Sequence, residues 1–260
     1  MKHLAAIWTF RHFLFALVRL DLRMKYKRSI LGVGWSLLHP ISMTIVYTIV
    51  FSNLLGADAK TYAPFLLCGL TVWAFMQQAA VYGSRALLGN EAYIRQSPLP
   101  FGLYSLRVVL GNAIHTAIAL VVVVALIVYL QGNLSAVMAI GAVVPGLILM
   151  FIASWAVATI AAFANVYFHD TQHLLEVASQ IGFFLTPIMY PRNLLDRQNL
   201  GWVVDMNPVN LFLELIRAPL LTGMAPDVSL YGPAVALTVV LVGLAAGTMA
   251  WLQKRVIFHL

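Results

Sequence analysis

The sequence predicts an all-α integral membrane protein with six transmembrane helices, an N-terminal cytoplasmic interfacial helix and short outer helices between the fifth and sixth spans. Three observations lead to this fold class: the composition, the long apolar runs and the uneven placement of lysine and arginine. Hydrophobic residues make up 62% of the 260 residues and charged residues only 10%, whereas soluble proteins carry about 25% charged residues. The mean hydropathy is +0.88.

Six apolar runs have about the length that a helix needs to cross a bilayer, which is roughly 20 residues for a hydrocarbon core of about 30 Å. Pro145 lies within the fourth run. The fifth run is short and contains Thr186-Pro187, which predicts a broken helix. We expect a cytoplasmic region over residues 1–34 and one transmembrane domain over 35–260. The predicted spans are residues 35–56, 62–83, 105–130, 137–166, 174–190 and 230–252.

Lysine and arginine fall mostly on one side of the predicted membrane. Seven precede the first span, three lie in or beside the loop after the second span and two lie in the C-terminal tail, so twelve of the sixteen share one side. Cytoplasmic loops carry the excess of these residues. Both termini are therefore expected in the cytoplasm, which requires an even number of spans. Topology also explains the net charge of +7 without a nucleic-acid partner.

The N-terminal arm has an amphipathic pattern. Arg11, His12, Arg19 and Arg23 share an arc of about 120° on a helical wheel, and large apolar residues lie mainly on the other side. This pattern favours a helix that lies along the cytoplasmic leaflet. A disordered basic tail is the alternative.

A cluster of cations follows directly, in "RMKYKRSILGVGWSLLHPI" at residues 23–41. Lys25, Lys27 and Arg28 lie at the cytoplasmic mouth of the first predicted span. Cations in this position attract anionic lipid headgroups. The same three residues are also candidates to bind the anionic end of a substrate.

The predicted spans contain few residues that suggest catalysis. His115 lies in the third span and Glu176 near the start of the fifth. His169 and His173 have a spacing that permits metal binding, but a loop entering a helix explains them better. No HExxH, GxSxG or GxxxxGK[ST] motif occurs in the sequence. We therefore expect no enzymatic activity, no metal and no cofactor on this chain, and a transporter built from it requires a gradient or an energy-supplying partner. No acid-rich intramembrane pathway is evident, which favours a partner.

The loop at residues 87–100 predicts a small cytoplasmic helix. Asn90 and Glu91 are placed to begin it, and Pro98 and Pro100 to end it. A rigid element of this kind suits docking to another protein. An ordinary connecting loop is the alternative.

The outer segment at residues 191–229 predicts a second short helix. Asn207 followed by Pro208 is typical of a helix start. Glu214 and Arg217 follow at a spacing that pairs side chains on one helix face. A helix that is apolar but too short to span should dip into the membrane or cover its outer face.

These segments together resemble the permease subunits of polysaccharide-exporting ABC transporters, in the type-2 ABC exporter group that exports O-antigen, capsule and teichoic acid. The resemblance extends over essentially all 260 residues. Its most specific part is a basic cluster around a tyrosine, followed by Ser-x-Leu-Gly-x-x-Trp-x-x-x-x-Pro leading into the first span. Many relatives have Arg-Asp where this chain has His169-Asp170. The other similar segments are "PFLLCGLTVWAFM", "SPLP", "LTPIMYP" and "MNPVN" followed by Glu214 and Arg217.

The resemblance implies half of a transporter in a bacterial cytoplasmic membrane. Two copies would form a homodimer around a pore, and two separate ABC ATPase subunits would bind ATP and Mg. The substrate would be a polysaccharide linked to undecaprenyl pyrophosphate, whose pyrophosphate end Lys25, Lys27 and Arg28 would receive. The implied ATPase-coupling residues are Asn90, Glu91, Ala92, Tyr93, Ile94 and Arg95. The implied gate on the outer side comprises Pro187, Pro191, Asn207, Pro208, Glu214 and Arg217.

A sliding glycan requires many weak contacts, and aromatic side chains supply them to the C–H faces of sugars. A lipid-facing or interfacial position is the alternative for each aromatic residue. A permease for teichoic acid or a hydrophobic drug is the alternative function within the group, and a gradient-driven transporter or an intramembrane transferase lies outside it. The candidate channel residues are Trp35, Tyr47, Phe51, Phe183, Phe184 and Tyr190.

Overall fold

The computed structural model describes residues 8–27, 29, 32, 34–56, 58–96, 99–132, 134–256 and 259, with the backbone alone at Leu55. Arg28 of the predicted cation cluster and Pro98 of the predicted docking loop lie outside these residues. The described residues form a bundle of helices and contain no strand.

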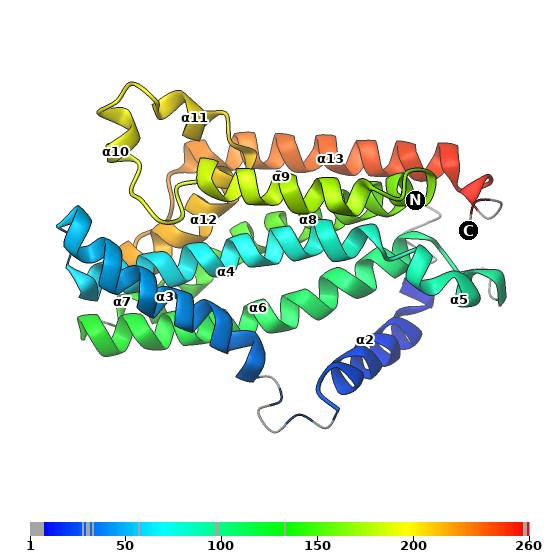
Figure 1. Cartoon of the computed structure of the whole chain (residues 1–260), viewed down its shortest axis with the longest axis horizontal. Helices are drawn as coiled ribbons and strands as arrows, with labels where there is room; N and C mark the ends of the chain where they lie inside the picture. The colour runs from blue at the N-terminus through cyan, green and yellow to red at the C-terminus, as the bar shows by residue number, and fades with distance from the viewer. Residues whose placement is uncertain are drawn as a thin grey trace.

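The bundle has five long helices; four of them run roughly along the longest axis of the molecule, and the first in the sequence crosses obliquely (Figure 1). The five are α3 (Gly34–Leu55), α4 (Ala59–Ser84), α6 (Gly102–Gln131), α8 (Ile140–Tyr167) and α13 (Tyr231–Leu252). The shorter elements are α2 (Arg11–Lys25), η1 (Leu88–Asn90), α5 (Glu91–Gln96), α7 (Ser135–Met138), α9 (Thr171–Leu185), α10 (Asn193–Asp196), α11 (Gly201–Asp205), α12 (Pro208–Thr222) and η2 (Val228–Leu230).

Five helices among the described residues are long and apolar enough to cross a membrane. They correspond to the first four predicted spans and the last. The fifth predicted span differs, because α9 ends at Leu185, just before Thr186-Pro187, and Thr186 is extended with ψ of 137°. The 15 residues of α9 rise only about 22 Å. Six spans of full length are therefore not confirmed, and the fifth segment is a short helix followed by a turn.

The two ends of the bundle carry different elements (Figure 1). At one end lie α5, the start of α6 and the C-terminal turn, and we call it the α5 end. At the opposite end lie α7, α10 and α11, and we call it the α11 end. Arg95 in α5 and Arg107 in α6 lie at the first end, whereas Asp196 in α10 and Asp205 in α11 lie at the second. These four residues agree with the predicted asymmetry of charge, although Arg192 and Arg197 flank α10 at the α11 end.

The core forms around α4, which packs against α3, α6, α8, α9 and α12. Small residues permit the closest approach, as they do in other membrane bundles. A β-carbon at Gly83 would lie 2.5 Å from the Cβ of Ala158 in α8. The α12 helix buries Phe212, Leu215 and Ile216 and packs against α4 and α8. It is therefore part of the bundle rather than a cover over it.

The predicted N-terminal helix is present as α2, and it packs on the bundle along one side. Leu14, Leu17 and Val18 form a buried cluster with Leu103 and Leu106 of α6. The chain then reaches the first span through a turn at Gly32, which has a φ of +51°. Only glycine adopts this conformation at no steric cost.

The contact between α4 and α8 generates a stability prediction. Replacing Gly83 with alanine forces the two backbones apart, because the nearest atoms include the Cα of Ala158 at 2.9 Å. We expect a loss of about 1–3 kcal/mol, measured as a lower unfolding temperature in detergent. The control is Gly111→Ala in α6, where no atom lies within 4 Å of the added carbon. Equal unfolding temperatures for the two variants would contradict the close packing.

Candidate functional site

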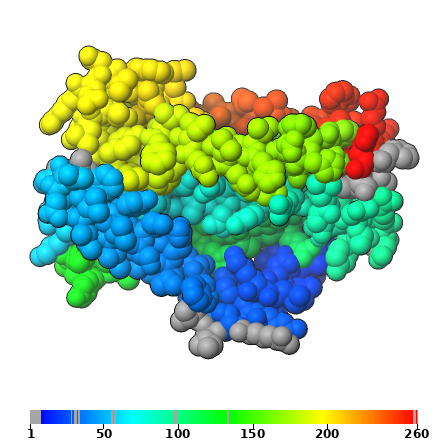
Figure 2. Space-filling model, in the orientation of Figure 1, coloured from blue at the N-terminus to red at the C-terminus, as the bar shows by residue number. Residues whose placement is uncertain are grey.

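A groove of about 920 Å³ lies between α3, α4, α6 and α9. In the space-filling view a recess is visible between α3 and α9, with α4 at its base (Figure 2). Lys25 at the end of α2 also lines the groove. The groove is therefore a shared surface of four helices and the N-terminal segment.

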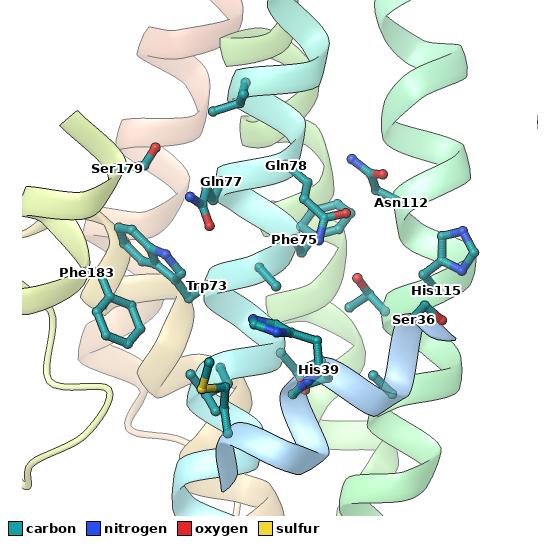
Figure 3. A pocket seen from close by; sticks show the side chains of 18 of the residues that line it. Ser36, His39, Trp73, Phe75, Gln77, Gln78, Asn112, His115, Ser179 and Phe183 are labelled. Atoms are coloured by element: carbon teal, nitrogen blue, oxygen red, sulfur yellow. The ribbon is translucent and has the colours of Figure 1, made fainter. Parts of the chain in front are cut away.

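One side of the groove is aromatic (Figure 3). Trp73 of α4 and Phe183 of α9 meet with their ring centroids 5.9 Å apart, and Phe184 lies 5.4 Å from Phe183. A glycine at position 182 permits this contact, because a β-carbon there would lie 2.9 Å from the Trp73 ring. The arrangement exposes ring edges and faces to the groove.

The other side is polar and carries neutral hydrogen-bonding groups. Figure 3 shows Gln78 of α4 near Asn112 and His115 of α6, with His39 of α3 between the two sides. Asn112 is only 8% exposed, and its amide nitrogen has no hydrogen-bond partner within the described part of the chain. A buried donor without a partner is costly, so this side of the groove is suited to a ligand with hydrogen-bond acceptors.

The structure brings together four of the six predicted channel aromatics. Trp35, Tyr47, Phe183 and Phe184 all line the groove. Phe51 is not among the lining residues and lies against Tyr47, with centroids 5.9 Å apart. The hydroxyl of Tyr190, beyond the end of α9, donates to the carbonyl oxygen of Phe184 at 2.7 Å.

Sequence reasoning missed Trp73, His39, Gln77, Gln78 and Asn112, all of which line the groove. The helices that carry them are apolar on every side, so no periodic pattern marks the face that lines the groove. One signal was present. Two adjacent amides, Gln77-Gln78, lie inside a predicted span, and polar groups in lipid are costly unless they serve a function.

The described part of the predicted cation cluster lies at one margin of the groove. Lys25 lines the groove, and Lys27 is exposed outside the lining. Between them, the hydroxyl of Tyr26 lies 3.2 Å from a ring nitrogen of His115. The cluster is thus joined to the polar side of the groove through a tyrosine that the sequence analysis gave no role.

The predicted docking residues at the α5 end divide into two sets. Ile94 is buried against Leu87 and Phe163, so it holds α5 onto the bundle. Asn90 accepts a hydrogen bond from Arg107 at 2.8 Å and also faces inward. The exposed set is Ala92, Tyr93 and Arg95, and Glu91 pairs with Arg95 at 2.9 Å.

The predicted outer gate is organised by a buried arginine. Arg217 is 4% exposed and donates to the carbonyl oxygen of Pro187 at 2.7 Å and to Glu214 at 2.5 Å. Its guanidinium also lies 4.1 Å from the ring centroid of Phe65 in α4. A buried charge of this kind requires partners, and those partners join α12, α4 and the turn after α9.

Two further contacts fix the same turn. Asn207 caps α12 by accepting a hydrogen bond from the backbone amide of Val209 at 2.9 Å, and Pro208 is the first residue of the helix. The side-chain amide of Asn207 also donates to the hydroxyl of Thr186 at 2.8 Å. The Tyr62 hydroxyl donates to the carbonyl oxygen of Met189 at 2.6 Å. Pro191, which follows this turn in the sequence, lines a second cavity of about 540 Å³.

Comparisons with known proteins agree with this architecture. Residues 12–221 match the family described as ABC-2 type transporter. An O-antigen export system permease protein RfbA of Klebsiella pneumoniae is 26% identical over 191 residues, which cover 73% of this chain and 72% of that protein. The protein of the same name in Myxococcus xanthus is 24% identical over 242 residues, 92% of each chain. Because the family match covers most of its length, this chain belongs to the ABC-2 type transporter family.

Proposed function

We propose that this chain is the membrane permease of an ATP-driven exporter that moves a lipid-linked, O-antigen-like polysaccharide across the bacterial cytoplasmic membrane. It functions as a homodimer together with two separate ATPase subunits, which bind ATP and Mg. Family membership supports a transporter component. The relatives in Klebsiella pneumoniae and Myxococcus xanthus, which are named as O-antigen export permeases, support the substrate class.

The observation that carries the proposal is the two-sided character of the groove. Sugar rings present C–H faces that stack on aromatic side chains, and they also present hydroxyl groups that accept hydrogen bonds from amides such as Asn112. A hydrophobic drug leaves such amides unpaired, at a cost of about 1–3 kcal/mol each. The groove therefore favours a polar polymer over a hydrophobic drug.

The charge of the groove favours a neutral glycan over a polyphosphate such as teichoic acid. Apart from histidines, its charged lining residues among those described are Lys25 and Glu176. A path for a polyanion requires a series of cations along its length. Lys25 at the margin is instead suited to one anionic group, and we assign it, with Lys27 and Arg28, to the pyrophosphate end of the substrate.

The open side of the groove supports a homodimer. The α3 helix forms one wall of the groove. Only 6% of its spanning segment is buried within the bundle, and its residues Ile45 and Ile49 are exposed. A second copy that faces this side completes the wall and closes two grooves into one pore. Two-fold symmetry of this kind is the commonest arrangement of soluble oligomers.

The orientation follows from the charge at the two ends of the bundle. The α5 end carries the cations and lies in the cytoplasm, together with both termini. There the exposed face of α5, with Tyr93 and Arg95, forms the docking surface for the ATPase. The gate around Arg217 lies at the opposite end, where the turn at Pro187 controls the exit from the groove.

Reconstitution tests the function directly. The permease and its ATPase subunit are placed in proteoliposomes with a fluorescent undecaprenyl-pyrophosphate glycan, and movement of the glycan to the opposite leaflet is followed. We expect movement only with ATP and both subunits. Transport by the permease alone, without the ATPase, would mean that the proposed energy source is wrong.

The division of α5 into two faces generates a prediction about coupling. Tyr93→Ala removes an exposed aromatic side chain of the docking surface and is expected to lower export about tenfold, as loss of an interface anchor does. Ile94→Ala should instead lower the free energy of unfolding by about 2–5 kcal/mol, because it creates a cavity. Export of polymer to the cell surface and the unfolding temperature separate the two effects.

The control for Tyr93 is Tyr129→Ala, which changes a tyrosine that is 84% exposed near the other end of α6. Export should be unchanged in this control. Wild-type amounts of surface polymer in Tyr93→Ala would argue against an ATPase contact at α5.

The polar side of the groove generates a second prediction. Asn112→Leu removes a donor that has no partner among the described residues, so stability should be unchanged or higher while export falls about three- to tenfold, the equivalent of one hydrogen bond. The control is Thr248→Val in α13, away from the groove, whose hydroxyl donates to the carbonyl oxygen of Leu244 at 2.8 Å. If both variants export equally, Asn112 does not contact the substrate.

A further inference from the structure

Two arginines contact helices on different sides of the groove: Arg85, at the start of the short segment that carries the proposed ATPase-docking surface, bonds to α9, and Arg107, in α6 beyond that segment, bonds to α2. The segment comprises residues 85–96 and is called the α5 segment below. We infer that Arg107 and Arg85 are positioning residues that connect the α5 segment to the two walls separately. The inference rests on the proposed ATP-driven function, because it assigns a path from the docking surface to the groove.

The first connection runs through Arg107 of α6. Its Nε donates to Asp21 Oδ2 of α2 at 2.5 Å, and a second nitrogen bonds the other oxygen of the same carboxylate. Its Nη1 donates to Asn90 Oδ1 at the start of the α5 segment, at 2.8 Å. The Arg107 side chain is 13% exposed. One planar guanidinium thus joins three elements with charge-assisted bonds.

Asp21 passes this connection to the groove through the last turn of α2. Lys25, one helical turn after Asp21, lines the groove. Tyr26 caps α2 and bonds to His115, another lining residue, at 3.2 Å. If the α5 segment shifts and Arg107 moves with it, the margin of the groove beside α2 therefore moves as well.

The second connection runs through Arg85, which caps the end of α4. Its Nε donates to Oε1 of Gln172 in α9. Gln172 in turn donates to Glu176 at 2.6 Å, and Glu176 lines the groove on the α9 side. Gln172, the middle residue of this connection, is 8% exposed, whereas Arg85 is exposed and the Glu176 side chain is 41% exposed. This connection reaches the wall that also carries Phe183.

The segment between the two arginine contacts is packed as one unit, together with Tyr104 of α6 and Phe163 of α8. Ala86 and Leu87 are buried with Ile94 in a single apolar cluster. Asn90 donates to the carbonyl oxygen of Ala86 at 2.8 Å, which closes the turn. Packed units of this kind shift as rigid bodies between discrete arrangements. A force on the exposed Tyr93 is therefore delivered to both arginine contacts.

The geometry favours arginine at both positions, because at position 85 the donor to Gln172 is Nε, where a lysine side chain has a carbon atom. A lysine ammonium is a point charge and lacks the planar fork that lets Arg107 bond both carboxylate oxygens and Asn90 at once. Arg107→Lys and Arg85→Lys preserve charge and approximate length, so the bundle should still fold. Each substitution is expected to disconnect one wall and leave the other connected.

Hydrogen exchange of the permease–ATPase complex in lipid nanodiscs tests this separation. Exchange is measured by mass spectrometry with and without a non-hydrolysable ATP analogue, in peptides covering residues 21–27 at the end of α2 and 171–178 of α9. In the wild type we expect the nucleotide to change exchange about tenfold in both peptides. In Arg107→Lys the response of the α2 peptide should fall below about twofold while that of the α9 peptide persists, and Arg85→Lys should show the converse.

Two additional variants keep the test decisive. Asp21→Asn should reproduce the effect of Arg107→Lys, because it removes the same ion pair from the other side. Arg19→Lys, at an exposed position on α2, should respond as the wild type does. If Arg107→Lys or Arg85→Lys lost the nucleotide response in both peptides, or in neither, the assignment of separate connections would be overturned. Absence of any nucleotide response in the wild-type complex would instead overturn the ATP-driven function itself.

Discussion

Lipid offers no hydrogen bonds, and the structure is arranged around this constraint. In a chain with 62% hydrophobic residues, each polar group in the bundle needs a partner within the protein. Arg217 obtains its partners from Pro187 and Glu214, and in doing so it fastens α12 into the bundle. Asn112 remains without a partner in the described residues. Thr48, Tyr104, Ser154, Asn165 and Asn210 also carry a buried polar atom without a partner among the described residues, but of this set only Asn112 lines the groove.

Much of the fold follows from the sequence, because apolar length and charge placement are direct physical requirements of a bilayer. The predicted second span, 62–83, corresponds to α4 at Ala59–Ser84, and the last, 230–252, to α13 at Tyr231–Leu252. The fifth span was predicted as broken, but the end of α9 at Leu185 depends on tertiary contacts. Arg217 and Tyr62 hold the turn from distant parts of the chain, and no local pattern encodes that.

The site was less predictable, because helix rotation is not encoded in a span that is apolar on all sides. Trp35 and Phe183 were placed in the channel by residue type, and both line the groove. Gln78 and Asn112 define its polar side, but their orientation emerges only from the packing of α4 against α6. Ile94 and Tyr93 were both predicted as docking residues, and the structure buries Ile94 while leaving Tyr93 exposed. The ion pair between Asp21 and Arg107 joins residues far apart in sequence, which spacing alone does not reveal.

The central claim is that a glycan passes along the groove, and photo-cross-linking during export tests it most directly. A photoreactive amino acid replaces Gln78 within the groove or, as the control, Val239 on the exposed side of α13. Cells that export labelled polysaccharide are then irradiated. The account predicts glycan attached to the permease from position 78 and none from position 239. Export that continues with no cross-link at 78, or with equal cross-links at both positions, would contradict it.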